Sequence, residues 1–156
     1  MALSRVTPIA PILFPRLVLE QVRPSVAYTG IVLSEASRTK LLRTLEGIMR
    51  GMEGWERVAH HLTLNMGPYK GDKAALGKSV KLRVTSWLVN DKVGAVGVEI
   101  LDPTLVCQNA HPHITVVVNR GAGGKPVMSN SLPWDDESQT VTINVALEGT
   151  VEEVAK

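Results

Sequence analysis

The sequence predicts an α+β domain built on a mainly antiparallel sheet with few helices. Residues 26–33 have the character of a strand, and a stretch of helical periodicity follows them directly before several alternating segments begin. The short turn Asn90-Asp91-Lys92 joins two of these segments, and strands joined by so short a turn are antiparallel. One helix among a run of strands is typical of the α+β class.

One helix is predicted to begin after Ser34, because serine is a residue type that caps helix N-termini. Apolar residues then recur at helical spacing as far as Met52. Glycines at positions 47, 51 and 54 weaken the later turns, so the helix is predicted to end between Arg50 and Gly54.

The later strands are predicted from alternating hydrophobicity and from the turn residues at their ends. They span residues 57–66, 80–89, 93–101, 112–119 and 140–147. Three other segments are predicted to lie outside the sheet: a glycine-rich loop over residues 120–126, an irregular or single-turn segment over residues 129–136, and a helical turn or frayed tail over residues 151–156. Residues 1–25 carry four prolines and are predicted to be an irregular leader, which leaves residues 26–150 as the domain.

The composition limits the function classes. A length of 156 residues suits one domain with a core of its own. The net charge of +2 is too small for a general nucleic-acid coat, although one local cluster is enough to bind a nucleotide or an RNA end. Cys107 is the only cysteine, which excludes an internal disulfide and a thiolate metal site and favours a reducing compartment such as the cytoplasm. No apolar run reaches membrane-spanning length, so no membrane partner is expected.

Two similar patterns carry the chemistry, His61-Leu62-Thr63-Leu64 and His113-Ile114-Thr115-Val116. On a strand, residues two apart point the same way, so each pattern places a histidine and a threonine on one face. If the two strands lie side by side, two imidazoles and two hydroxyls converge. Histidines exchange protons near neutral pH, and hydroxyls hydrogen-bond phosphate oxygens. The predicted catalytic residues for metal-free phosphodiester chemistry are therefore His61, Thr63, His113 and Thr115, with the roles of base and acid left open between the histidines.

The two patterns resemble the paired His-x-Thr motifs of the 2H phosphoesterase (LigT-like) superfamily. Its members include bacterial 2′-5′ RNA ligase-like proteins and the cyclic phosphodiesterase domains of fungal and plant tRNA ligases. The second half of the chain is most similar to the tRNA-ligase branch, because residues 111–116 resemble its second motif and residues 124–133 resemble the segment that follows it. The resemblance covers residues 26–148.

The resemblance implies a two-lobed sheet with the active cleft between the lobes. It also implies hydrolysis of a 2′,3′-cyclic phosphate at an RNA or nucleotide end, leaving a 2′-phosphate, with no metal and no cofactor. The expected partner is a nucleotide or RNA 3′ end that bears a cyclic phosphate, or a cyclic oligonucleotide, and the chain is expected to act as a monomer.

Six residues near the patterns are candidates for substrate binding. Asn65 shares the predicted face of His61, basic side chains after the second pattern are placed to meet phosphate charge, and aromatic residues are placed to stack on a base. The candidates are Asn65, Tyr69, Arg120, Lys125, Asn130 and Trp134. The backbone amides of residues 121–124 offer an anion cradle. Alternation sends His60 and His111 to the opposite face or into a loop, so both are expected to be non-catalytic.

Three alternatives remain at this stage. The first is that the chain is a stand-alone enzyme of this type that degrades cyclic di- or oligonucleotide or 2′-5′-linked signals, as some phage-encoded relatives do against bacterial immunity. A nucleotide-binding module keeps the pocket without turnover, although retention of all four motif residues argues against it. A metal site could use the four histidines, but strand alternation separates neighbouring histidines and no carboxylate completes the set.

Overall fold

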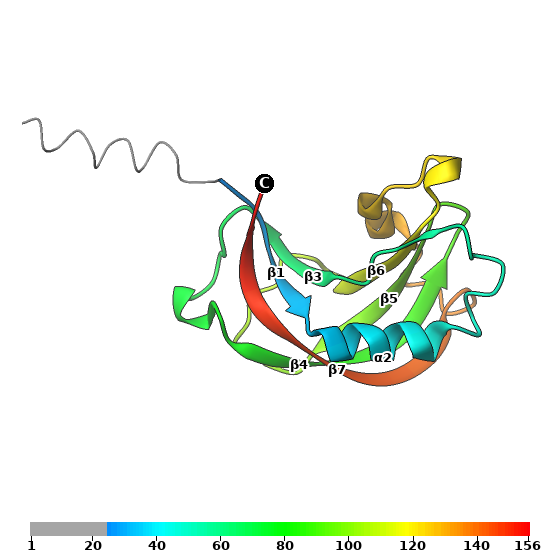
Figure 1. Cartoon of the computed structure of the whole chain (residues 1–156). Coiled ribbons are helices and arrows are strands. Elements are labelled where there is room, and N and C mark those ends of the chain that lie inside the picture. The colour runs from blue at the N-terminus through cyan, green and yellow to red at the C-terminus, as the bar shows by residue number, and fades with distance from the viewer. Residues whose placement is uncertain (1–24) are drawn as a thin grey trace, which may run out of the picture.

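The alternating segments form seven strands within residues 25–156, the part of the chain that the computed structural model describes (Figure 1). The strands are β1 (Val26–Leu33), β2 (Glu56–Arg57), β3 (His61–Met66), β4 (Ser79–Val89), β5 (Val93–Ile100), β6 (His113–Val118) and β7 (Val141–Ala155). The helices of this part are α2 (Glu35–Leu45) and three short 3-10 helices, η1 (Lys73–Ala75), η2 (Arg120–Ala122) and η3 (Pro126–Ser131). The leader expected over residues 1–25 lies almost wholly outside the described residues.

The strands pair in the order β2-β6-β3-β1-β7-β4-β5, and β5 pairs in turn with β6. Six strands, all except β2, therefore close into a barrel, and every pairing in it is antiparallel. The predicted α+β class with a mainly antiparallel sheet and few helices is confirmed, whereas the division into two lobes stays a prediction. Within residues 25–156, no helix has the length and hydropathy that a membrane crossing requires.

The helix begins where the sequence predicts, because the Ser34 hydroxyl accepts a hydrogen bond from the Ser37 amide at 3.1 Å. Its predicted end between residues 50 and 54 is wrong, since α2 stops at Leu45 and turns follow. Gly51 has a φ of 88°, which the helix cannot contain. Met49 is nevertheless 3% exposed, so its helix-like spacing reflects burial from a turn.

The single strand predicted over residues 57–66 is wrong, because the structure has two strands there, β2 and β3, with a break between them. The break lies directly before His61. Residues 58–60 leave regular strand geometry at Ala59, which has a φ of 41° and is fully buried. The amides of Val58 and Ala59 still donate to the carbonyls of Val116 and Thr115 at 2.7 and 3.0 Å. The chain therefore stays beside β6. The side chain of His60, which follows Ala59, no longer points where strict strand alternation would place it.

The prediction of a helical turn or frayed tail at the C-terminal end is wrong, because residues 151–155 continue β7. The first half of β7 pairs with β4 and the second half with β1, so this strand closes the barrel. Gly149 allows the close approach, since a Cβ there would lie 2.6 Å from the carbonyl oxygen of Val32. Val151 is fully buried, whereas the acidic residues beside it gave the segment its polar character.

The buried residues form two clusters that lie on opposite faces of β5. Val96 and Val98 belong to the main core inside the barrel, together with Leu62 and Ile114. The smaller cluster contains β5 residues of the alternate face and the apolar residues that follow η3. It consists of Leu88, Val93, Ala95, Val118 and Leu132, with Val58, Met128 and Trp134 packed against it. This cluster holds η3 over β5 and β6, on the face opposite the main core (Figure 1).

Candidate active site

The two His-x-Thr patterns lie on neighbouring strands, β3 and β6, in antiparallel register. Leu62 pairs with Ile114, and both are fully buried in the main core. In an antiparallel pair the residues on either side of this contact oppose each other crosswise. His61 therefore lies next to Thr115, and Thr63 next to His113. Because side chains alternate, all four point to the face opposite the core and are half-buried there.

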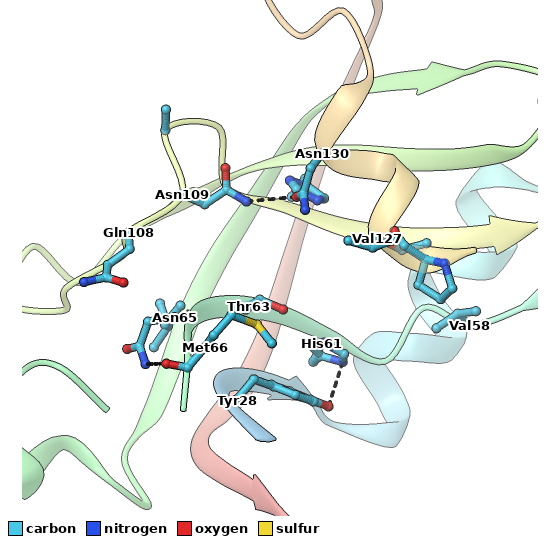
Figure 2. Close-up of a pocket in the computed structure, with 15 residues that line it drawn as sticks. Tyr28, Val58, His61, Thr63, Asn65, Met66, Gln108, Asn109, Val127 and Asn130 are labelled. Carbon is cyan, nitrogen blue, oxygen red and sulfur yellow. Dashed lines mark hydrogen bonds between the residues drawn. The ribbon is translucent and has the colours of Figure 1, made fainter. Parts of the chain in front are cut away.

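These four side chains line one pocket of about 690 Å³, a volume typical of small-ligand sites. The other lining residues are Tyr28, Val58, Leu64, Asn65, Met66, Gln108, Asn109, Ala110, Pro126, Val127 and Asn130. Figure 2 shows Asn109 and Asn130 on one side of the pocket and Thr63, Met66 and His61 on the other. The structure thus brings together all four predicted catalytic residues and two of the six predicted binding residues.

His61 is held on its Nδ1 side by two other rings. The Tyr28 hydroxyl lies 3.3 Å from His61 Nδ1, and the two rings stack with centroids 4.4 Å apart (Figure 2). The Nδ1 atom of His60 lies 3.0 Å from the same nitrogen. Nε2 is therefore the nitrogen of His61 that remains for a ligand in the pocket.

The expectation that His60 points away from His61 is wrong. Strict alternation would separate the two rings, but the positive φ of Ala59 breaks the strand just before them. The contact of His60 with His61 is one reason why the pKa of His61 is lowered from 6.5 to about 4. Burial is the largest cause, followed by the charges of His60 and of His113. His61 is neutral at pH 7 in the ligand-free protein.

This pKa predicts a pH dependence of stability. The unfolded chain binds a proton at His61 near pH 6.5, whereas the folded chain binds it only near pH 4. The contribution is therefore fully present above pH 6.5 and is lost as the pH falls toward 4, by up to about 3 kcal/mol. Urea unfolding at about pH 7.5 and about pH 4.5 measures it. His61→Phe should lose less stability between these two pH values than the wild type, and an equal loss in both proteins would contradict the assignment.

His113 has a defined tautomer when neutral. Its Nδ1 lies 2.8 Å from the backbone carbonyl oxygen of His111, and a carbonyl only accepts, so Nδ1 carries the proton. Nε2 then holds a lone pair for the pocket. Burial lowers the pKa of His113 and the charge of His111 adds to this, while the bond to the carbonyl raises it.

Trp134 supports His113 from behind and does not line the pocket. The two rings stack with centroids 5.2 Å apart, and the indole Nε1 donates to the Ser129 carbonyl at 3.0 Å. A Cβ on Gly97, the strand partner of His113, would touch the indole at an ordinary 3.4 Å and would overlap the hydroxyl oxygen of Ser86. The structure therefore places Trp134 against a catalytic candidate, where the sequence predicts a stacking surface for a base.

The two threonine hydroxyls differ in their partners. Thr115 Oγ1 lies 2.7 Å from the hydroxyl of Ser129, which is fully buried, and 3.3 Å from the carbonyl of Pro126. Thr115 therefore also fastens η3 over the pocket. Thr63 Oγ1 makes no hydrogen bond within residues 25–156, so its hydroxyl is ready for a ligand.

Asn65 and Asn130 line the pocket, but the Asn65 amide is already fully engaged. Its Nδ2 donates to the carbonyls of three residues, and its Oδ1 accepts from the Lys70 amide at 3.1 Å. Asn65 thus shapes the loop after β3. Asn130 Oδ1 accepts a longer bond, 3.4 Å, from Asn109, which leaves its Nδ2 for a ligand.

Tyr69, Arg120 and Lys125 do not line the pocket. Tyr69 is 3% exposed in the main core, and its hydroxyl accepts from the Val106 amide at 2.9 Å. Arg120 pairs with Glu56 at 2.7 Å. Lys125 is exposed and directly precedes Pro126 of the pocket wall.

The glycine-rich loop does not present the row of free amides that an anion cradle needs. The amides of Ala122, Gly123 and Gly124 donate within the loop, to the carbonyls of Asn119 and Arg120. His111 lies 3.5 Å from Asp135 through Nε2 and 43% of its side chain is exposed, outside the pocket. Among residues 25–156 there is no group of three or more histidine, cysteine or acidic side chains arranged to hold a metal ion.

Several pocket residues are not predicted from the sequence, of which Tyr28, Gln108 and Val127 are the clearest. Tyr28 lies on a predicted strand, two residues before Gly30. Only the pairing of β1 with β3 brings its side chain to His61. Gln108 lies in a loop, and its backbone amide donates to the Leu64 carbonyl. No local sequence pattern encodes this contact.

Similarity to known proteins identifies the barrel and its pocket as a phosphodiesterase domain. The family described as the fungal tRNA ligase phosphodiesterase domain matches residues 46–154, well over half of the chain. The chain belongs to this family of phosphodiesterase domains.

A solved structure supports the fold. The crystal structure of a fungal RNA kinase superposes with a TM-score of 0.55 at 16% identity, covering 92% of this chain and 48% of that one. The chain thus spans about half the length of that structure, and at this identity the likeness shows the fold alone. No curated protein shows significant similarity to the chain.

Proposed function

We propose that this chain hydrolyses 2′,3′-cyclic phosphates at RNA or nucleotide ends without a metal ion and leaves a 2′-phosphate, as a 2H-type enzyme. The observation that supports this most is the crosswise arrangement of His61, Thr63, His113 and Thr115 at one pocket. Two proton-transfer groups and two hydroxyls then surround one phosphorus atom. The pocket walls on either side, β1 with β3 and β6 with η3, would correspond to the two expected lobes.

The reaction needs both histidines in different protonation states. One neutral imidazole takes a proton from water as the water oxygen attacks phosphorus in line. The bond from phosphorus to the ribose 3′ oxygen breaks, and the other histidine, protonated, gives its proton to that oxygen. The hydroxyls of Thr63 and Thr115 stabilise the charge on the phosphoryl oxygens. The pKa of each histidine is lowered in the free protein, so the bound phosphate anion is needed to raise the pKa of the one that acts as acid.

Substrate binding divides between the pocket and its rim. We propose that Asn130 contacts the nucleotide directly and that Lys125 reaches its phosphate charge from the rim. Asn65 and Trp134 act by shaping the loop after β3 and by supporting His113. Arg120 contributes only if its pair with Glu56 opens, whereas Tyr69 lies in the main core and is not proposed to bind substrate.

A chelation experiment tests the metal-free chemistry. With EDTA present throughout, hydrolysis of 2′,3′-cyclic nucleotides should stay within about twofold of the untreated rate, because proton transfer and hydroxyl hydrogen bonds replace a Lewis acid. Loss of activity on chelation, restored by one added divalent metal, would contradict the proposal.

A substrate panel tests the substrate class. Turnover of 2′,3′-cyclic mononucleotides and RNA ends to 2′-phosphates is the expected result, measured by separation of the 2′- and 3′-phosphate products. Turnover of cyclic di- or oligonucleotides alone would favour a signal-degrading enzyme. Binding without hydrolysis of any compound would favour a nucleotide-binding module.

A further inference from the structure

The ring of His61 lies against Gly30 of the neighbouring strand. Gly30 of β1 pairs with Thr63 of β3, and a Cβ on Gly30 would lie 3.4 Å from Cδ2 of His61 and 2.8 Å from the Leu62 carbonyl oxygen. A Cβ here would crowd the Leu62 carbonyl, whereas it would only touch the His61 ring. Tyr28 lies two residues earlier and therefore on the same face of β1. Its ring stacks on the imidazole of His61.

Tyr28 restrains His61 in two separate ways. The two rings are nearly parallel, with an interplanar angle of 22°, so the tyrosine ring fixes the plane of the imidazole. The hydroxyl faces Nδ1 at 3.3 Å, so it also fixes which nitrogen points away from the pocket. Burial and then the charge of Glu152 raise the pKa of Tyr28, which keeps its proton at neutral pH and can donate it to Nδ1.

We infer that Tyr28 is a positioning residue for His61, holding the ring by stacking and donating to Nδ1, which His60 Nδ1 also faces at 3.0 Å, so that the neutral ring carries its proton on Nε2. This inference rests on the proposed function for its catalytic meaning, although its structural content does not. His113 has the opposite tautomer, with the proton on Nδ1. The pocket is then offered a hydrogen-bond donor from one ring and a lone pair from the other, an asymmetry that suits a reaction with one proton taken and one given.

The tautomer is measured directly by nitrogen NMR of the histidine side chains in the substrate-free protein. The wild type should show His61 as the Nε2–H form. Tyr28→Phe keeps the stacked ring and removes the hydroxyl, so the His61 signals should move toward a mixture of the two neutral forms. The ionisable groups that face His61 are His60, His113 and Tyr28, and the spectra are therefore recorded at one fixed pH.

Kinetics give the second readout. Tyr28→Phe should lower kcat roughly tenfold with KM little changed, because the substrate binds as before while the His61 ring, no longer held by the hydroxyl, less often points Nε2 at the phosphate. Tyr28→Leu also removes the stacked ring and should lower kcat further. Tyr69→Phe is the matched control, since Tyr69 also uses its hydroxyl in one hydrogen bond but lies in the core. That control should lose stability and keep kcat.

The inference is overturned if Tyr28→Phe leaves the His61 tautomer unchanged, or if kcat and stability respond to Tyr28→Phe no differently than to Tyr69→Phe. Absence of cyclic phosphate hydrolysis in the wild type would overturn the proposed function instead. The NMR comparison would still decide how Tyr28 acts on His61.

Discussion

His113→Ala and His61→Ala are each expected to lower the rate of cyclic phosphate hydrolysis by roughly 10²-fold or more. Each substitution removes one of the two groups that exchange protons during the reaction. Tyr28, the other ionisable side chain among the described lining residues, keeps its proton at neutral pH and does not replace either histidine. Because the two histidines act on one transition state, the double variant should be little slower than the slower single variant. Initial rates on a 2′,3′-cyclic mononucleotide measure all three.

His111→Ala is the matched control for this prediction. His111 also neighbours the second pattern, but its ring lies outside the pocket and only its backbone carbonyl contacts His113. Every residue supplies such a carbonyl, so this variant should keep its rate within about threefold. Circular dichroism and thermal unfolding confirm that each variant folds. Retained activity in His61→Ala or His113→Ala would remove that residue from catalysis.

The features that the sequence predicts correctly depend on local patterns. Alternation in His61-Leu62-Thr63 and in His113-Ile114-Thr115 gives the face of each side chain, and both faces are as predicted. Ser34 caps α2 because a serine before a helix needs only its own hydroxyl and a nearby amide. A β-strand period and a helix cap are properties of a few consecutive residues, so one sequence is sufficient to find them.

The features that the sequence does not predict depend on distant segments or on a single backbone angle. Val151 is buried because β7 meets β1, and Tyr28 reaches His61 because β1 meets β3. These pairings follow from barrel closure, which the order of elements alone does not specify. His60 contacts His61 because of the positive φ of Ala59, a conformation that alanine rarely adopts and that composition does not reveal.

The same distinction applies within the site. The sequence gives the type of Thr115 but not its bond to Ser129, and it gives Tyr69 and Trp134 as aromatic residues without placing one in the core and the other behind His113. A residue type limits what a side chain can do. Only the tertiary contacts decide whether it meets the substrate or holds a neighbour.

Ile114→Ala is expected to lower the free energy of unfolding by about 2–5 kcal/mol, because it leaves a cavity in the main core. Ile114 is fully buried, whereas Ile48, in the turns after α2, is 37% exposed. Ile48→Ala is therefore the matched control and should cost less than about 1 kcal/mol. Urea unfolding at neutral pH measures both, and similar costs for the two variants would contradict the core position of Ile114.

The position of Ile114 also links stability to the site. Within residues 25–156, Leu62 and Ile114 form the one ladder pair between β3 and β6, and the four His and Thr side chains flank this pair. With a small residue at 114, β6 can shift relative to β3, which moves His113 away from Thr63. Ile114→Ala should therefore lose several-fold in kcat even at a temperature where the variant is fully folded, whereas Ile114→Val, which removes one methyl group, should lose little. If Ile114→Ala loses stability but keeps kcat, a contact other than Leu62–Ile114 holds the register of the catalytic strands.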